Sequence, residues 1–461
     1  KGSEFCNLYK NSPIMLRVKL IYIFSFIGLT ILLDFFGIFT HFLEITYDSD
    51  FVYPYEDDVH EFVNALRHNA KPAVNPINDY NYSYVIENKQ KCVDTAYNNF
   101  RVVYIIKSAM ENADRRSAIR NSWGFEKRFF DVPSRTLFLL GVHPNDDELQ
   151  NKIKLEAAKY KDIVQVNFTD TYYNNTIKTM TGFKWLVQHC LNSKFYMFVD
   201  DDMYVSVKNV LRFIRNPANY PDYLKEPKKF GAHKREISEA DLKEVLDIKN
   251  KMTQTNINIS SNKNISIHYN KQILKQNVDN NTLTTVPLIT NTTKDNYKKF
   301  DGHLKNSWKE VIKSQEYSRL NRPKRQIFDF ELPEDVRLFA GFVIVSSPHR
   351  HKSSKWYVPL SEYPYHLWPP YITAGAYILS KEALLDMYYT SLYTKLFRFD
   401  DIFLSLVAKK ADIEPFHCEE FHFYKKDYTK FNYKYVITSH GYSDPGELLY
   451  VWNEQKALGN A

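Results

Sequence analysis

Between residues 100 and 200 the sequence alternates short apolar runs with stretches of helical spacing, and this alternation restricts the fold more than any other feature. Short runs rich in Val, Ile and aromatic residues predict buried strands, whereas apolar residues that recur on one helical face predict helices. The predicted strands are 100–107, 135–142, 163–168, 195–199 and 338–346, and the predicted helices are 114–123, 148–160, 178–190, 381–388 and 402–410. Strands that alternate with helices form a mostly parallel sheet with helices on both faces. The expected fold is therefore α/β, a three-layer sandwich around a mostly parallel sheet.

Three consecutive acids, Asp200, Asp201 and Asp202, follow the strand predicted at 195–199. Like charges this close repel each other unless a positive group lies among them. Because alternate side chains of an extended chain face the same way, Asp200 and Asp202 can converge on one cation. Oxygen ligands suit Mn²⁺ or Mg²⁺ rather than zinc, and ligands of such sheets gather at the carboxyl ends of strands. The alternative is a solvated turn whose acids cap the next segment.

The composition is that of a globular chain without a marked preference for nucleic acid. Of 461 residues 44% are hydrophobic, and 61 basic against 54 acidic residues give a net charge of +7 that is spread along the chain. This mild excess comes with no zinc-knuckle spacing or RNA-binding aromatic signature, so no nucleic-acid partner is expected. The four cysteines form no CxxC pair, which argues against a zinc site. One disulfide among Cys92, Cys190 and Cys418 would leave one thiol over, and the sequence does not fix the pairing.

Residues 20–39 form an almost unbroken apolar run that only Asp34 interrupts. About 20 apolar residues suffice for a helix to cross a bilayer, so we expect a transmembrane signal anchor here. Basic residues precede the run and acidic residues follow it, which places residues 1–19 in the cytoplasm and the rest in the lumen, as in a single-pass type II protein. A cleaved signal peptide and a buried core helix are the alternatives. The polar, proline-containing stretch 40–95 is expected to be a stem.

The stretch 234–326 is rich in Asn, Lys, Ser and Thr and is expected to be a disordered surface insertion. It ends in RPKR (322–325), which is either a dibasic processing site or, with more weight, a solvated charge run. Seven N-x-S/T triplets agree with a lumenal location. They begin at Asn81, Asn167, Asn174, Asn258, Asn264, Asn280 and Asn291.

Six motifs occur in a specific order: RRSAIRNSWG (115–124), LFLLG (137–141), FTDTYYNNTIKT (168–179), FVDDDMYV (198–205), WPPYITAGAYILS (368–380) and RFDDIFLSLVA (398–408). Together they resemble glycosyltransferase family 31, the β-1,3-glycosyltransferases. Within that family the chain is most similar to the brainiac type. The stretches that carry this similarity are SKWYVPLSEYP (354–364), HCEEFHF (417–423) and SHGYSDPGELLYVWNE (439–454). The insertion at 234–326 departs from the family pattern.

The resemblance implies a GT-A catalytic domain over 96–458, a UDP-sugar donor and a divalent metal, usually Mn²⁺. Brainiac-type enzymes are similar to β-1,3-N-acetylglucosaminyltransferases of glycosphingolipid synthesis. We therefore expect an inverting transfer of GlcNAc to the 3-hydroxyl of a glycolipid or glycoprotein acceptor at the Golgi membrane. Transfer of galactose or N-acetylgalactosamine stays open, because other members of the family use those sugars. A non-catalytic lumenal glycan-binding protein of the same fold is the alternative from another class.

The resemblance also implies which residues bind the metal and the nucleotide. Asp202 is expected to bind the metal directly, Asp200 to bind the ribose or the metal through water, and Asp201 to make a structural or nucleotide contact. His440 lies where the family places a histidine that completes the metal shell, and imidazole can share Mn²⁺ with carboxylates. A plain turn residue before Gly441 is the alternative for His440.

Asp401 matches the catalytic base of the family, with Asp400 beside it. A carboxylate within hydrogen-bond reach can take the proton of the acceptor hydroxyl. The alternative is that both acids cap the helix that begins at Ile402. A helix needs one cap rather than two, which favours catalysis.

Arg116 and Arg120 are four residues apart on a predicted helix and therefore share a face. Guanidinium groups suit phosphate or uracil contacts, and plain surface charge is the alternative. Lys107, at the end of the first strand, is expected to contact the nucleotide. Trp368 and Tyr371 are expected to shape the acceptor site, because sugar rings stack on aromatic faces, although aromatic residues are more often part of the core.

Overall fold

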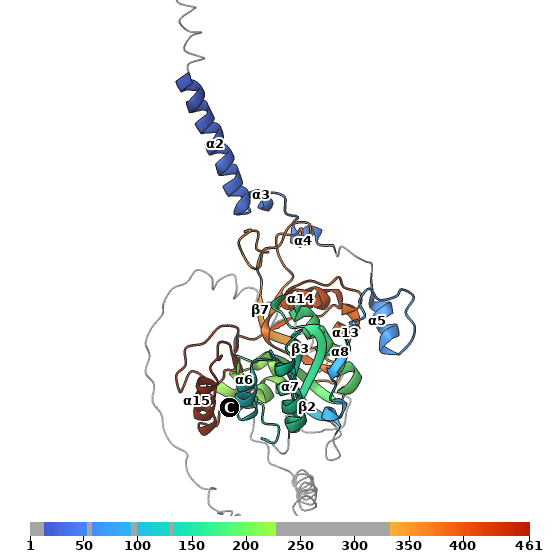
Figure 1. Ribbon diagram of the computed structural model, residues 1–461. Helices are drawn as coiled ribbons and strands as arrows, with labels where there is room; N and C mark the ends of the chain where they lie inside the picture. Colours follow the sequence, from blue (N-terminus) through green and yellow to red (C-terminus); the bar gives the residue numbers. More distant parts are fainter. Residues whose placement is uncertain (1–12, 53–57, 94–98, 129–131, 227–331) are drawn as a thin grey trace, which may run out of the picture.

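The computed structural model describes residues 13–52, 58–93, 99–128, 132–226 and 332–461 (Figure 1). Its centre is an eight-stranded sheet in the order β1-β4-β3-β2-β5-β8-β7-β9. The strands are β1 (Tyr84–Ile86), β2 (Phe100–Lys107), β3 (Ser134–Val142), β4 (Ile163–Thr169), β5 (Ser193–Asp200), β7 (Phe339–Ile344), β8 (Tyr371–Ser380) and β9 (Phe416–His417). Strands β4, β3, β2 and β5 are parallel, whereas β8 runs antiparallel to both β5 and β7. The predicted insertion 234–326 lies outside the described residues.

Helices cover both faces of this sheet. One face packs against α8 (Asn175–His189), α13 (Lys381–Ser391) and α14 (Asp400–Lys410). The other packs against α6 (Ala113–Arg120), α7 (Asp147–Tyr160), α9 (Val207–Arg215) and α15 (Pro445–Ala457). Alternate residues of a strand face opposite ways, and in β2 Ile105 joins the first core while Tyr104 joins the second. The predicted α/β fold with a mostly parallel sheet is confirmed, and it is consistent with the GT-A architecture.

Short elements complete the fold beside the main sheet. They are the second sheet of β10 (Phe421–His422), β11 (Thr438–Ser439) and β6 (Tyr204–Val205), the helix α10 (Asp222–Lys225), and the 3₁₀ turns η1 (Lys89–Cys92), η2 (Tyr172–Asn174) and η3 (Pro217–Asn219). The second sheet matters for function because β6 comes directly after the aspartate triplet and β11 directly before His440. It therefore brings these two parts of the chain together.

The N-terminal apolar run does not form the predicted transmembrane helix over 20–39. Helix α2 (Pro13–Phe35) ends before Gly37, which separates it from α3 (Ile38–His41). Gly37 has a positive φ of 78°, and a Cβ there would lie 2.5 Å from the carbonyl oxygen of Arg350, so only glycine permits this turn. Among the described residues, no helix combines the length and apolarity needed to cross a bilayer. The helix expected over 20–39 thus ends at Phe35, before this turn.

The region predicted as a stem, residues 40–95, contributes side chains to the folded domain. It contains α4 (Tyr47–Asp50) and α5 (His60–Arg67), and α5 packs against α13. Val63 of α5 and Tyr80 are buried in the core that α8, α13 and α14 also line. Burial of such apolar side chains stabilises the domain by about 1.5–3 kcal/mol each. These residues are therefore part of the packed structure.

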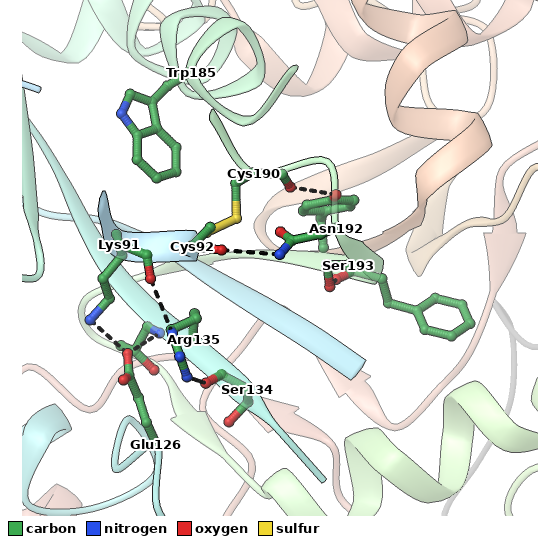
Figure 2. Close-up of a disulfide and its surroundings, with 12 residues drawn as sticks. Lys91, Cys92, Glu126, Ser134, Arg135, Trp185, Cys190, Asn192 and Ser193 are labelled. Atoms are coloured by element: carbon green, nitrogen blue, oxygen red, sulfur yellow. Dashed lines mark hydrogen bonds and ion pairs between the residues drawn. A yellow bond between two sulfur atoms is a disulfide. The ribbon is translucent and has the colours of Figure 1, made fainter. Parts of the chain in front are cut away.

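One disulfide joins this N-terminal region to the end of α8. Figure 2 shows Cys92, the last residue of η1, bonded to Cys190 at the end of α8, with a Cα–Cα distance of 5.3 Å. Asn192 donates a hydrogen bond of 3.0 Å to the carbonyl of Cys92 beside it. Cys418 is buried and not disulfide-bonded. The count expected from the sequence, one disulfide and one remaining thiol, is confirmed.

Candidate active site

Asp200 and Lys107 face each other at the carboxyl ends of β5 and β2, where the parallel register pairs the two residues. Lys107 Nζ lies 3.1 Å from Asp200 Oδ1 and 3.0 Å from Asp400 Oδ2, and it also donates to the carbonyl of Ala374 at 3.1 Å. Thr179 of α8 donates a further hydrogen bond of 3.1 Å to Asp400 Oδ2. One buried ammonium group thus links the aspartate triplet to the acid pair at the start of α14.

The charges of Lys107, Asp200 and Asp400 shift the pKa values of Lys107 and Asp200. Burial lowers the pKa of Lys107, but Asp200 and Asp400 raise it more, so its pKa lies above the usual value. Burial raises the pKa of Asp200 to about 6 against the opposing effect of Lys107, and the charges of Asp202 and Asp400 also raise it. Lys107 therefore stays charged at neutral pH and holds two acids that would otherwise repel each other.

Asp201 points away from Asp200, as the alternation of an extended chain predicts. Its carboxylate accepts hydrogen bonds from Ser108 Oγ at 2.7 Å, Asn112 Nδ2 at 2.8 Å and Arg115 at 2.9 Å. The carboxylate is buried. Three donors around a buried carboxylate fix its position and also tie the loop after β2 to the aspartate triplet. The contact of Asp201 with this loop is structural, and a nucleotide contact stays a prediction.

Asp202 and His440 come together across the second sheet. His440 Nε2 lies 3.3 Å from Asp202 Oδ2, and the amide of Tyr442 donates to the carbonyl of Asp202 at 2.7 Å. Burial raises the pKa of Asp202, but the contact with His440 outweighs it and the net pKa is lowered. The pKa of His440 is raised, mainly by its bond to Asp202. Each partner therefore favours the charged form of the other.

The donor set of Asp202 and His440 fits a hard divalent metal. Asp202 Oδ1 is buried and accepts no hydrogen bond from any residue that the structure describes, so one ligand atom is available. Carboxylate oxygen with imidazole nitrogen suits Mn²⁺. Within the described ranges, no group of three His, Cys, Asp or Glu side chains is close enough to hold a metal by itself. Asp200 contacts Lys107, and its predicted role in binding the ribose, or the metal through water, stays a prediction.

Asp401 occupies the second position of α14. The N-cap residue of that helix is Phe399, and no side-chain cap bond is formed by it, whereas Asp401 Oδ1 accepts from the amide of Ile402 at 2.8 Å. Burial and then the charge of Asp400 raise the pKa of Asp401 to about 7. The side chain is partly exposed, unlike that of Asp400. A partly exposed carboxylate with this pKa can accept a proton near neutral pH.

Arg116 and Arg120 lie on α6 but are engaged by other residues. Arg116 is buried and donates to both carboxylate oxygens of Glu156, at 2.9 Å and 2.7 Å. Arg120 forms a bidentate pair with Asp162, at 2.7 Å and 2.9 Å. Instead, the structure brings Arg115 to the aspartate triplet. The sequence offers no signal for this choice, because adjacent arginines on a helix differ only in the direction they face.

Trp368 and Tyr371, predicted to shape the acceptor site, differ in exposure. Trp368 is buried, with its ring 4.1 Å from that of Tyr363, and so belongs to the core. Tyr371 is partly exposed at the start of β8, and its hydroxyl lies 3.1 Å from Ser346 Oγ. Burial raises the pKa of Tyr371, and the charge of Asp401 raises it further, which places Tyr371 near that acid.

Two groups of acids thus lie at one edge of a mostly parallel sheet, one suited to a metal and one suited to accept a proton. Together with the three-layer fold, this arrangement is consistent with the class of GT-A glycosyltransferases. The family model described as galactosyltransferase matches residues 114–236 and 330–419. The chain belongs to glycosyltransferase family 31, and β-1,3-glycosyltransfer is the activity of that family.

Curated relatives agree with this membership. The chain is 31% identical over 454 residues to the β-1,3-galactosyltransferase brn of Drosophila melanogaster, covering 98% of this chain and 99% of the relative. It is 24% identical over 382 residues to human β-1,3-galactosyltransferase 1, covering 83% and 81% of the two chains. It is also 33% identical over 182 residues to human lactosylceramide 1,3-N-acetyl-beta-D-glucosaminyltransferase, covering 37% of this chain and 45% of the relative.

Proposed function

We propose that the protein is an inverting β-1,3-glycosyltransferase that moves a sugar from a UDP-sugar to the 3-hydroxyl of a glycan, with Mn²⁺ as its metal. In this reaction the acceptor oxygen forms a bond to C1 of the sugar, and the bond between C1 and the diphosphate oxygen breaks. The hydroxyl proton passes to Asp401, and UDP leaves. Inversion requires the base and the leaving group to lie on opposite faces of the sugar.

The observation that carries this proposal is that the pKa values of two carboxyl groups, those of Asp202 and Asp401, are shifted in opposite directions. The pKa of Asp202 is lowered, in spite of burial, by its bond to His440, whereas burial and Asp400 raise the pKa of Asp401 to about 7. Acids whose surroundings separate their pKa values in this way take different chemical roles. Asp202, whose pKa is lowered, suits binding of a metal ion, and Asp401, whose pKa is raised, suits the role of proton acceptor.

Asp202 and His440 would hold the metal, and water and diphosphate oxygens would complete its shell. When bound, Mn²⁺ supplies positive charge that stabilises the leaving diphosphate. Asp201 keeps the neighbouring Asp202 in place through its bonds to Ser108 and Arg115. Lys107 keeps Asp400, and through it the start of α14, close to the triplet. These contacts position both acids before any substrate arrives.

For the donor we propose UDP-GlcNAc and, as the acceptor, a glycosphingolipid. The partial match to the human lactosylceramide N-acetylglucosaminyltransferase supports this choice. UDP-galactose is the second candidate, because the relatives matched over most of their length are named galactosyltransferases. We place the reaction at the Golgi membrane. The disulfide between Cys92 and Cys190 supports a compartment of the secretory pathway, since such bonds persist in oxidising surroundings.

A donor panel tests the proposal directly. The full chain is incubated with Mn²⁺, a lipid-linked acceptor and either UDP-GlcNAc, UDP-galactose or UDP-N-acetylgalactosamine, and released UDP and the product mass are measured. We expect one donor to give both UDP and a glycan with one added sugar. The Asp401→Asn variant is the matched control and should form no product. Absence of UDP release with every donor would favour the non-catalytic glycan-binding alternative.

A further inference from the structure

Three exposed aromatic side chains gather beside α14 and have no role in the site described above. Tyr172 is 50% exposed, Tyr173 is 56% exposed and Trp356 is 43% exposed. The rings of Tyr172 and Tyr173 lie 5.6 Å apart in an edge-to-face arrangement. Trp356 Nε1 donates a hydrogen bond of 2.8 Å to the hydroxyl of Tyr172, although 184 residues separate the two in sequence. We call these three residues the aromatic platform.

The platform is attached to the elements that carry the acids. Tyr172 and Tyr173 belong to η2, directly before α8, and Thr179 of α8 donates to Asp400. On the other side, Arg398 donates to the carbonyl of Tyr357, the neighbour of Trp356, and to Glu362 Oε1 at 2.7 Å. Arg398 lies two residues before Asp400 in the chain. Hydrogen bonds of neighbouring residues therefore link both halves of the platform to the segment at the start of α14.

The negative charges of Asp400 and Asp401 affect the pKa of a platform residue. Burial raises the pKa of Tyr172, and the negative charges of Asp401 and Asp400 raise it further. A cation also lies there, because Lys355 Nζ is 4.3 Å from the centre of the Trp356 ring. Exposed aromatic faces, a hydrogen-bonding hydroxyl and a nearby ammonium group together suit a molecule with an apolar face and polar edges. A pyranose ring has this character.

We propose that the aromatic platform is the acceptor subsite, where a pyranose ring of the acceptor packs on Trp356 and Tyr172 while its free hydroxyl reaches Asp401. This inference rests on the proposed glycosyltransferase function. Trp356 is a binding residue for the acceptor in this arrangement and takes no part in donor binding. The residues proposed for the metal and the nucleotide lie instead at the ends of β2 and β5, in the turn after β5 and in the loop before α15. The sequence motif SKWYVPLSEYP (354–364) thereby acquires a specific role.

The test compares Trp356→Ala with wild type, with Trp356→Phe as the conservative variant. Tyr450→Ala is the matched control, since Tyr450 is 64% exposed but lies on α15, which packs on the opposite face of the sheet (Figure 1). We expect Trp356→Ala to raise the acceptor KM about tenfold and to leave the donor KM unchanged. Trp356→Phe should restore most of the affinity, and Tyr450→Ala should behave as wild type. An unchanged acceptor KM in Trp356→Ala would overturn the inference.

A binding measurement keeps the inference testable independently of turnover. Saturation-transfer NMR with methyl β-D-galactopyranoside and methyl β-D-mannopyranoside reports whether the wild-type chain binds a pyranose at all. If the wild type releases no UDP but binds a glycoside that Trp356→Ala does not bind, the enzymatic proposal fails while the platform stands. If the wild type and Trp356→Ala bind both glycosides equally, or neither binds, the platform is rejected. Tyr172→Ala removes the other ring on which the pyranose is proposed to pack, and it repeats the test if Trp356→Ala does not fold.

Discussion

Lys107 Nζ lies 3.0 Å from Asp400 Oδ2 while also contacting Asp200, so one buried cation joins two acid motifs that are 200 residues apart in sequence. The parallel pairing of β2 with β5 places Lys107 beside Asp200, and α14 brings Asp400 to the same point. The ammonium group of Lys107 therefore links the aspartate triplet directly to the acid pair of α14, and Thr179 gives Asp400 a second contact.

Replacing Lys107 with Met should destabilise the protein strongly. The substitution leaves the buried Asp400 and the partly exposed Asp200 without their cation. Loss of one partner of a buried ion pair costs about 3–5 kcal/mol. Denaturant unfolding followed by circular dichroism measures the change. Lys152→Met is the control, because Lys152 pairs with Glu148 on the surface and should change stability little. Equal stability of Lys107→Met and wild type would show that the two acids are protonated and need no cation.

The transfer rate should depend on pH through Asp401. Burial and the charge of Asp400 raise the pKa of Asp401 to about 7, so the acid is protonated below that pH and cannot accept the acceptor proton. The value of kcat/KM should therefore fall about tenfold per pH unit below about pH 6 and level off above about pH 8. A pH profile with saturating metal measures this. Asp401→Asn should lose at least about 100-fold in rate and keep UDP binding.

Metal-dependent nucleotide binding should depend on Asp202. Asp202→Ala removes the buried oxygen that accepts no hydrogen bond within the described part of the chain, together with the partner of His440. Titration calorimetry of UDP in the presence of Mn²⁺ should then show affinity no greater than that of the wild type with EDTA. His440→Ala should weaken binding less, since one ligand remains. Wild-type affinity in Asp202→Ala would place the metal elsewhere.

The sequence predicts the fold better than it predicts the site. The continuous apolar run over 100–107 predicts β2 with its observed bounds, because a strand that is buried on both faces has few polar residues. The contact of Lys107 with Asp400 is not predictable in this way, since it depends on how α14 packs. The position of Trp356 beside Tyr172 is equally unpredictable from the sequence, because it depends on the folded shape of the loop. Helical spacing pairs Arg116 with Arg120, but it does not show that acids on neighbouring elements occupy both.

The contact between Arg350 and Glu44 leads to a prediction about the loop that carries Trp356. Arg350 is buried and donates to Glu44 Oε1 at 2.7 Å, to the carbonyl of Val358 at 2.7 Å and to that of Tyr363 at 2.9 Å. The guanidinium group thus holds the loop in one shape, and Glu44, from the N-terminal segment, balances its charge. Loss of a buried partner is costly because the remaining charge is uncompensated.

Glu44→Ala should therefore loosen this loop and, with it, the aromatic platform. We expect faster amide hydrogen exchange over residues 349–366 and a higher acceptor KM, with exchange in β2 unchanged. Asp48→Asn is the control, because Asp48 is an exposed acid in the same N-terminal segment. Hydrogen exchange followed by mass spectrometry separates the two regions. Since loops open locally at a lower free energy than the core, an effect confined to 349–366 would identify the N-terminal segment as a support for the acceptor side. Unchanged exchange there would mean that the loop carbonyls bonded to Arg350, those of Val358, Tyr363 and Tyr365, suffice to hold it.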